Sequence, residues 1–141
     1  MSKSTVYKVQ VMFGDCDPAG IVFFPNYLKW MDAASLHFFM ECGVPPWRDY
    51  EKLTGIIGTP LLEIKTNFHK SATYGEHLEV HTTIDEWRTK VVIQRHRVFR
   101  QDTDGPTLLC DGTEVRAFVQ RLGDGRLKAV PVPEEVRQKC A

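Results

Sequence analysis

Long β segments fill the second half of this 141-residue chain, and they constrain its fold more than any other feature. Turn signals such as Gly75 and Gly123 separate one segment from the next. An earlier strand is predicted where apolar and polar residues alternate from Tyr7 to Phe13. The later segments span residues 61–69, 77–88, 91–101 and 107–121. Successive strands joined by short turns predict an antiparallel sheet.

Only one stretch, residues 26–42, shows the spacing of a long helix. Asn26 is expected to be its N-cap and Gly43 its C′ residue, and Pro45 and Pro46 prevent any continuation. A helix of this kind, about 16 residues long, spans about 24 Å. Its apolar stripe consists of Leu28, Met31, Phe38 and Phe39, with Ser35 and Cys42 continuing it.

One strand, one long helix and a run of antiparallel strands indicate an α+β fold, a single domain over residues 1–141. The helix is expected to lie across a curved antiparallel sheet. Because a single helix covers only one face of so much sheet, another face or edge needs a partner chain.

Composition excludes several classes of protein. Hydrophobic residues make up 43% of the chain, which is typical of a globular domain rather than a disordered one. The 18 basic and 18 acidic residues give a formal net charge of zero, which argues against a nucleic-acid partner. No apolar run is long enough to span a bilayer, and the N-terminal residues show no signal-peptide core. The four cysteines form no Cys-x-x-Cys pair. A reduced, cytoplasmic protein without membrane contact is therefore expected.

The densest cluster of unusual residues runs from Phe13 to Tyr27. It carries Asp15 and Asp17, then Pro18 and Gly20, and leads into the predicted helix. One interpretation is a plain turn, since turns favour these residue types. The other is a catalytic site, because a helix N-terminus offers unpaired N–H groups that stabilise an oxyanion. A carboxylate held just before it, Asp17, is placed to attack a thioester carbonyl or to activate water.

A second cluster is basic, and it too has two interpretations. Its members are either a solvated set of strand and turn positions or a site for a small polyanion such as the phosphates of coenzyme A. Arg88 and Lys90 fall at a predicted turn between strands, where side chains converge most easily. The full cluster comprises Arg88, Lys90, Arg95, Arg97 and Arg100, joined later by Arg126 and Lys128.

Other chemistry finds little support. No Gly-x-Ser-x-Gly, Gly-x-Gly-x-x-Gly or Walker sequence is present. No His/Cys/carboxylate cluster supports a metal at Asp15 and Asp17, so no metal site is predicted. Cys16 is disfavoured as a nucleophile because adjacent carboxylates oppose its ionisation.

Taken together, the motif Asp15-Cys-Asp-Pro-Ala-Gly-Ile-Val22 followed by Pro25-Asn-Tyr27 resembles the 4-hydroxybenzoyl-CoA thioesterase family of hot-dog proteins. The similarity covers nearly the whole chain. It continues through Trp30, Asp32-Ala-Ala-Ser35, Cys42-Gly43, Pro45-Pro-Trp-Arg48, Gly58-Thr-Pro60, Glu86-Trp-Arg88, Lys90 and Gln94-Arg-His96.

The resemblance implies an acyl-CoA thioesterase acting on an aromatic acyl group, with coenzyme A as part of the substrate and no cofactor. By this resemblance, Asp17 matches the catalytic carboxylate, and Phe24 matches the residue whose backbone N–H polarises the carbonyl. Asp32 and Thr59 match substrate-binding positions near the acyl group. It also implies active sites at subunit interfaces, in homodimers that commonly pair into homotetramers. The residues that it implies in contact with the phosphates of coenzyme A are Arg88, Lys90, Arg126 and Lys128.

Two residues depart from the family pattern, and alternatives stay open. Phe24 replaces a His or Tyr of many relatives, which leaves only its backbone N–H, and Thr89 replaces a basic residue. Aromatic side chains suit a flat acyl group but are also common in cores; they are Phe23, Phe24, Trp30 and Trp47. A thioesterase for aliphatic acyl-CoA or acyl carrier protein is the first alternative, and a non-catalytic acyl-CoA-binding module is the second.

Overall fold

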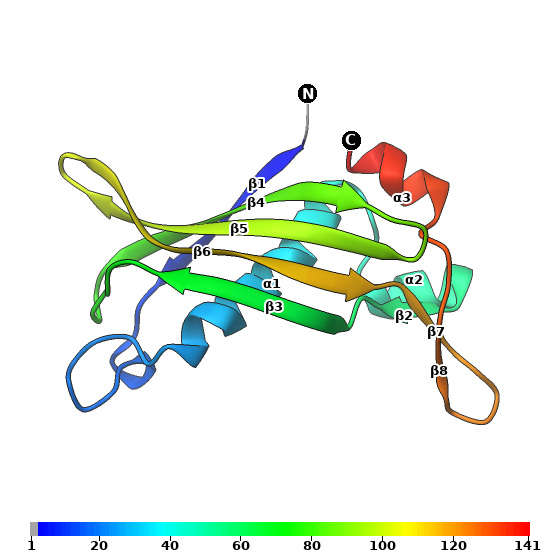
Figure 1. Ribbon diagram of the computed structural model, residues 1–141, viewed down its shortest axis with the longest axis horizontal. Helices are drawn as coiled ribbons and strands as arrows, with labels where there is room; N and C mark the ends of the chain where they lie inside the picture. The colour runs from blue at the N-terminus through cyan, green and yellow to red at the C-terminus, as the bar shows by residue number, and fades with distance from the viewer. Residues whose placement is uncertain (1–2) are drawn as a thin grey trace.

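A computed structural model describes residues 3–141, and its main feature is a twisted five-stranded antiparallel sheet with a long helix behind it (Figure 1). The order of the strands is β1-β4-β5-β6-β3. The strands are β1 (Ser4–Gln10), β3 (Leu61–Phe68), β4 (His77–Trp87), β5 (Val91–Asp102) and β6 (Gly105–Ala117). The predicted α+β arrangement, one long helix on an antiparallel sheet, is confirmed.

The helix α1 (Pro25–Glu41) packs mainly on β1 and β4. Gly43 follows it with φ of 94°, as expected for a C′ residue. The prediction for Asn26 is wrong, because the N-cap is Phe24 and Pro25 takes the first helical position. Asn26 is already helical, and its side chain donates instead to the backbone carbonyl of Asp15.

The first strand ends earlier than the alternation predicts. After Gln10 the chain turns into a short 3₁₀ helix, η1 (Phe13–Asp15). The Asp15 carboxylate accepts a hydrogen bond from the Met12 N–H at 2.8 Å, which stabilises this turn. Of the residues that continue the pattern, Val11 is buried outside any strand, whereas Met12 and Phe13 are exposed and Phe13 begins η1.

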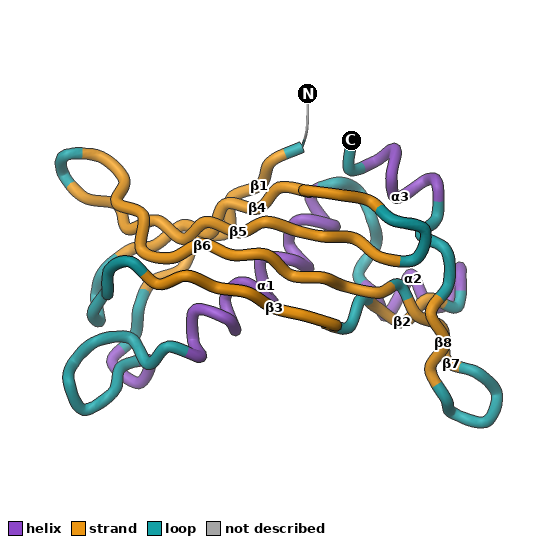
Figure 2. The backbone as a smooth tube through the Cα atoms, viewed as in Figure 1, coloured by secondary structure: helices purple, strands orange, loops and turns teal. Residues whose placement is uncertain are grey.

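The segment predicted as one strand over 107–121 is two strands. Phe118 separates them, because its N–H donates to the carbonyl of Lys90 rather than to a neighbouring strand of the main sheet. The chain then enters a small second sheet, drawn at the right of Figure 2 beside two short helices. The elements here are α2 (Trp47–Thr54), β2 (Ile56–Gly58), β7 (Val119–Arg121), β8 (Leu127–Ala129) and α3 (Glu134–Lys139), of which only β7 falls within a predicted strand.

The core has two apolar halves. One lies under the N-terminal half of α1 and contains Trp30 and Met31, and the other contains Phe38, Phe39 and Phe118. Between them, a band of buried polar side chains crosses the inner face of the sheet. Thr82 is paired with His96, and Gln94 with Glu114, across neighbouring strands, so each pair points to the same face.

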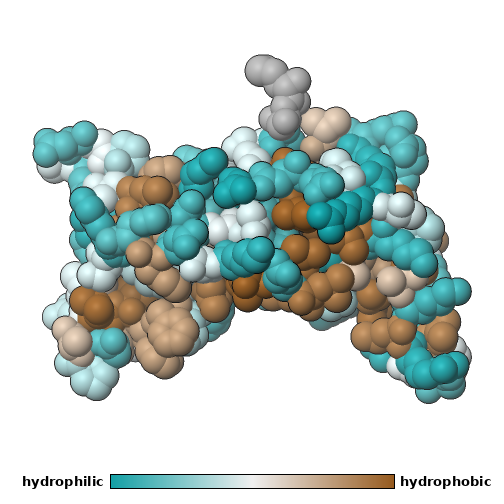
Figure 3. Space-filling view, viewed as in Figure 1, coloured by the Kyte–Doolittle hydropathy of each residue, from teal (hydrophilic) through white to brown (hydrophobic). Residues whose placement is uncertain are grey.

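The strand β3 leaves one edge of the main sheet open. Its partners in β6 show that Ile64 and Phe68 point to the inner face, yet both side chains are exposed. Leu61 and Leu62 are exposed as well. Figure 3 shows hydrophobic residues gathered along the lower border of the view, where β3 and the loop after β1 lie. An apolar open edge of this kind has unpaired backbone groups with which another chain can pair.

Candidate active site

Asp17 lies in a short hairpin between β1 and α1. The Asp17 N–H donates to the carbonyl of Ile21 at 2.9 Å, and the Phe23 N–H donates to that of Asp15 at 2.9 Å. Gly20 has φ of 82° and donates its N–H to the Asp17 carbonyl, so the predicted reversal is confirmed. Ala72 holds the base of the hairpin by accepting a hydrogen bond from Val22.

The carboxylate of Asp17 is only partly engaged. Its Oδ1 accepts a hydrogen bond from the Ala19 N–H at 2.8 Å, which fixes the orientation of the side chain. Its Oδ2 has no hydrogen-bond partner within residues 3–141. A half-buried carboxylate with one oxygen held and the other free is suited to act as a nucleophile or a base.

The start of α1 leaves one backbone donor available. Pro25 has no N–H, and the N–H groups of Asn26 and Tyr27 donate to the carbonyls of Phe23 and Phe24. The N–H of Phe24 itself has no partner among the described residues. It lies at the positive end of the helix dipole, where it is suited to bind a carbonyl oxygen that becomes negative. The side chain of Phe24 is 58% exposed and carries no proton donor.

An apolar cavity of about 290 Å³ adjoins this helix start. The rings of Phe24 and Phe68 meet edge to face on its wall, with centroids 6.3 Å apart, and Tyr27 packs on Phe68. Burial raises the pKa of Tyr27 to about 12, so this phenol stays neutral at physiological pH. The cavity is therefore lined by aromatic side chains of both the start of α1 and β3.

A second cavity, of about 410 Å³, contains the two residues expected at the acyl group. Asp32 and Ser35 reach it from α1, and Thr59 from the segment between β2 and β3. Trp47 and Leu127 complete its apolar wall, whereas Trp30 is buried in the core. The structure thus brings Asp32 and Thr59 together, as the resemblance implied. It places them about two helical turns along α1 from Phe24.

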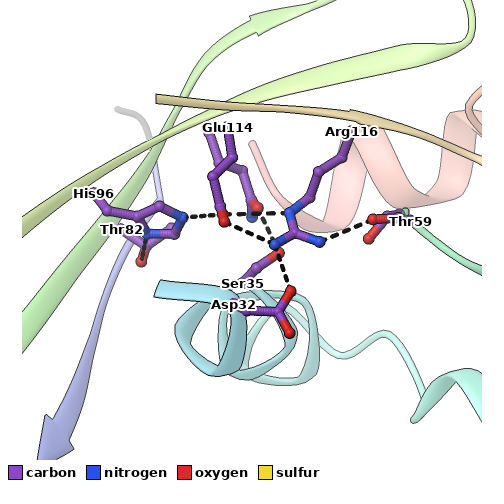
Figure 4. Close-up of polar contacts among 8 residues, drawn as sticks. Asp32, Ser35, Thr59, Thr82, His96, Glu114 and Arg116 are labelled. Carbon is purple, nitrogen blue, oxygen red and sulfur yellow. Dashed lines mark hydrogen bonds and ion pairs between the residues drawn. The ribbon is translucent and has the colours of Figure 1, made fainter. Parts of the chain in front are cut away.

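Beneath the second cavity lies a network of buried polar groups (Figure 4). Arg116 donates to Asp32 at 2.7 Å, to the backbone carbonyl of Thr59 at 2.9 Å and to Glu114 at 2.9 Å. Glu114 accepts from His96 at 2.5 Å, and His96 contacts Thr82 at 2.8 Å. The network connects the interior of the sheet with the wall of the cavity.

The charge of Glu114 is stabilised by its neighbours. Burial by itself raises the pKa of this carboxyl. The hydrogen bonds and charges of His96 and Arg116 outweigh that effect and hold the pKa below its ordinary value. Glu114 is therefore an ionised carboxylate with no exposed surface, a state that needs both partners.

Sequence reasoning missed Glu114 and Arg116. They stand on a strand in phase with Gly112 and Phe118, which face the core, so charged residues occupy inward positions of the alternation. That phase is the signal that would have found them. It was obscured because the same segment was predicted to continue as one strand beyond Phe118.

The basic residues separate into different groups. Arg88 and Lys90 lie in the β4–β5 turn, and Arg126 and Lys128 on the β7–β8 hairpin, both at the right end of the molecule in Figure 1. Leu127, between the last two, lines the second cavity. The remaining basic residues do not join them: Arg95 pairs with Asp85, Arg100 pairs with Asp102, and Arg97 is exposed on β5.

Comparison with known proteins agrees with this fold. Residues 11–140 match the model of the Thioesterase-like superfamily, so the chain belongs to that family. It is 42% identical to the 4-hydroxybenzoyl-CoA thioesterase of Pseudomonas sp. (strain CBS-3) over 100% of both chains.

Solved structures extend the likeness. The D17N mutant of 4-hydroxybenzoyl-CoA thioesterase complexed with 4-hydroxybenzoyl-CoA has a TM-score of 0.94 and 41% identity, covering 98% of this chain and 99% of that one. A gentisyl-coenzyme A thioesterase has a TM-score of 0.82 and 34% identity, covering 97% and 100%. The fold is the hot-dog fold. Within residues 3–141, no helix is long and apolar enough to cross a membrane.

Proposed function

We propose that this protein hydrolyses an aromatic acyl-CoA, 4-hydroxybenzoyl-CoA or a similar benzoyl-CoA, to the free acid and coenzyme A. The observation that carries the proposal is the pairing of a half-free carboxylate, Asp17, with an available N–H, that of Phe24, on two sides of one hairpin. The full-length relative that acts on 4-hydroxybenzoyl-CoA supports the choice of substrate.

In this mechanism the Phe24 N–H binds the thioester carbonyl oxygen and stabilises the charge that develops on it. The Asp17 carboxylate then acts in one of two ways. It attacks the carbonyl carbon, forming a mixed anhydride and expelling the thiolate of coenzyme A, and water cleaves the anhydride. Alternatively, it removes a proton from water as the water attacks, and passes that proton to the departing thiolate. Neither route needs a cofactor or a metal.

The acyl group is assigned to the cavity that contains Asp32 and Thr59. A polar group buried beside an aromatic ring discriminates strongly for a substituent that hydrogen-bonds to it. The phosphates of coenzyme A are assigned to four basic residues of the β4–β5 turn and the β7–β8 hairpin, and Leu127 of that hairpin forms part of the cavity wall. They are Arg88, Lys90, Arg126 and Lys128.

A homodimer completes this site. When two β3 strands pair antiparallel about a two-fold axis, the Leu61 end of one lies beside the Phe68 end of the other. Leu61 follows Thr59 by two residues, and Phe68 packs on Phe24. The pairing therefore brings the acyl cavity of one subunit towards the Asp17 hairpin of its partner, and it covers the open apolar edge. Association of two dimers into a homotetramer is part of the proposal, as the family resemblance implies.

The proposal includes a cytoplasmic location. Four free thiols suit a reducing compartment, since an oxidising one favours disulfides.

The test measures thiol release from 4-hydroxybenzoyl-, 3-hydroxybenzoyl-, benzoyl-, phenylacetyl-, acetyl-, hexanoyl- and palmitoyl-CoA. Fast turnover of one aromatic ester is expected, and Asp17→Asn is expected to lower kcat at least ~10³-fold. Asp15→Asn is the matched control, because asparagine retains the acceptor for Met12 and so keeps the turn. A bias towards aliphatic esters would replace the aromatic assignment, and binding without turnover would favour a non-catalytic module.

Single-turnover hydrolysis in ¹⁸O-water separates the two roles of Asp17. Attack of water on the aspartyl carbon of an anhydride transfers label to the enzyme, whereas general-base catalysis leaves the carboxylate unlabelled. Mass spectrometry of the peptide that carries Asp17 reads the outcome.

A further inference from the structure

Arg116 is a buried cation that joins the core to the wall of the acyl cavity. Arg116 is 5% exposed, whereas the side chain of Asp32, its partner at 2.7 Å, is 64% exposed. Four of its five N–H groups are accounted for: Nε and Nη2 bind Glu114, Nη2 also binds Asp32, and Nη1 binds the carbonyl of Thr59. Figure 4 shows the guanidinium lying between Asp32 and Thr59.

This arrangement exceeds what the fold requires. A buried Arg–Glu pair is no more stabilising than well-packed apolar residues, because both charges lose their hydration. Arg116 also reaches two groups from other elements, Asp32 on α1 and Thr59 before β3, and both line the cavity. The guanidinium is planar and rigid, so a partner on the buried side fixes the donors on the opposite side.

The partner on the buried side is itself held in place. Glu114 accepts hydrogen bonds from both His96 and Arg116, and His96 is fixed in turn by Thr82. Thr82, His96 and Glu114 have no exposed surface. Buried residues of the sheet thus fix the position of the guanidinium, and the guanidinium in turn fixes Asp32 at the cavity wall.

We propose that Arg116 is the positioning residue for selection of the acyl group, and that Glu114 orients it. Arg116 holds Oδ1 of Asp32, which leaves Oδ2, without a partner among residues 3–141, to accept a hydrogen bond from the acyl ring. It also fixes the main chain at Thr59, a second residue of the cavity wall. This inference rests on the function proposed above.

The charges define the class of substituent that the cavity takes. Asp32 is the charged group of this network with an exposed side chain, 64% against 5% for Arg116, and its carboxylate carries a formal charge of −1. A carboxylate accepts hydrogen bonds but donates none. The cavity therefore favours a ring with a neutral donor, a hydroxyl or an amino group. It disfavours an unsubstituted ring, and it disfavours a ring carboxylate most strongly.

The test compares kcat/KM for 4-hydroxybenzoyl-CoA, benzoyl-CoA and 4-carboxybenzoyl-CoA in Arg116→Gln. The ratio of hydroxylated to plain substrate is expected to fall at least ~10-fold, with benzoyl-CoA hydrolysis within about threefold of the parent, as loss of one directed hydrogen bond predicts. In Asp32→Asn the ratio falls as well, and adding Arg116→Gln to it changes the ratio by less than about twofold. Arg95→Gln, which breaks a comparable ion pair with Asp85 on the outer face, leaves the ratio unchanged.

A merely structural role for Arg116 predicts a different result. The kcat/KM values for 4-hydroxybenzoyl-CoA and benzoyl-CoA would then fall by the same factor, or the Asp32 and Arg116 substitutions would have multiplying effects on their ratio. Either result overturns the proposal. If Arg116→Gln fails to fold, the double variant Glu114→Gln/Arg116→Gln removes both buried charges together and is expected to show the same loss of selectivity.

A crystal structure of the Arg116→Gln variant tests positioning without any substrate. Displacement of the Asp32 carboxylate supports the proposal, and an unchanged carboxylate overturns it. Failure of the proposed function appears elsewhere, as absence of aromatic turnover in the parent protein, so the two failures are distinguishable.

Discussion

The side-chain Nδ2 of Asn26 donates a hydrogen bond to the backbone carbonyl of Asp15 at 2.8 Å, which joins the first turn of α1 to the hairpin that carries Asp17. This contact sets the Asp17 carboxylate relative to the Phe24 N–H. Asn26→Ala is expected to lower kcat about 10- to 100-fold, since small displacements of reacting groups have effects of that size. KM is expected to change by less than about threefold.

Steady-state kinetics with the preferred acyl-CoA measure this effect. Lys29→Ala, an exposed position one turn further along α1, is the control and is expected to retain full activity. A kcat for Asn26→Ala within about twofold of the parent would show that the hairpin keeps its position without this bond.

The main strands and α1 were predictable because their signals are local. Apolar residues recur with period two in the strands and near 3.6 in the helix, and both periods report which face is buried. The Asp17 hairpin was predictable for a similar reason, since Pro18 and Gly20 specify a turn from neighbouring residues alone. The end of the first strand was not, because it depends on a hydrogen bond from the Met12 N–H to the Asp15 carboxylate.

The hydrogen-bond network at Arg116 could not be predicted from local sequence patterns. Its members come from α1, β4, β5, β6 and the segment before β3. Those on strands meet through register, with Gln94 opposite Glu114 and Val92 opposite Arg116, whereas Asp32 and Thr59 meet Arg116 through tertiary packing. A charged residue at an inward position indicates a buried pair but does not identify the partner. The break at Phe118 has the same origin, because its N–H donates to Lys90, distant in sequence.

Glu114 makes stability depend on pH in a definite direction. Its folded-state pKa lies below its ordinary value, so the unfolded chain takes up a proton more readily. The stability that it contributes is present above the unfolded pKa of about 4.3 and is lost as the pH falls through the lower folded value. Relative to Glu114→Gln, the parent is expected to be about 3 kcal/mol more stable at pH 7, with the difference shrinking below about pH 4.

Chemical denaturation at a series of pH values between 7 and 3.5 measures this difference. The exposed Glu63→Gln serves as control and is expected to change the free energy of unfolding by less than about 0.5 kcal/mol throughout. A difference for Glu114→Gln that stays constant across the range would contradict an ionised carboxylate held by His96 and Arg116.

Gly112 allows β3 and β6 to approach closely. A Cβ at this position would lie 2.0 Å from the backbone carbonyl oxygen of Lys65, so alanine cannot fit without separating the strands. Gly112→Ala is expected to lower the free energy of unfolding by about 3 kcal/mol or more, as overpacking against rigid backbone does. Gly123→Ala, with no atom within 4 Å of the added Cβ, is the control and is expected to be nearly neutral. Equal stability of the two variants in thermal unfolding would show that β3 moves away at little cost.

The open edge of β3 allows the homodimer and the site to be tested together. Ile64 points to the inner face of the sheet and is exposed, whereas Asn67 points to the outer face of the same strand. Ile64→Lys places an unpaired charge in the proposed interface and is expected to weaken dimerisation at least ~10²-fold. Asn67→Lys adds the same charge on the solvent side and is expected to leave the dimer intact. Circular dichroism confirms that both variants fold.

Sedimentation velocity measures the assembly, and activity as a function of enzyme concentration measures its consequence. Because Asp17 of one subunit is proposed to meet the acyl cavity of its partner, specific activity of Ile64→Lys should rise with protein concentration as dimers re-form. The parent and Asn67→Lys should show constant specific activity over the same range. A fully active monomer of Ile64→Lys would place the carboxylate and the acyl cavity in one subunit, and would remove the reason for pairing two β3 strands.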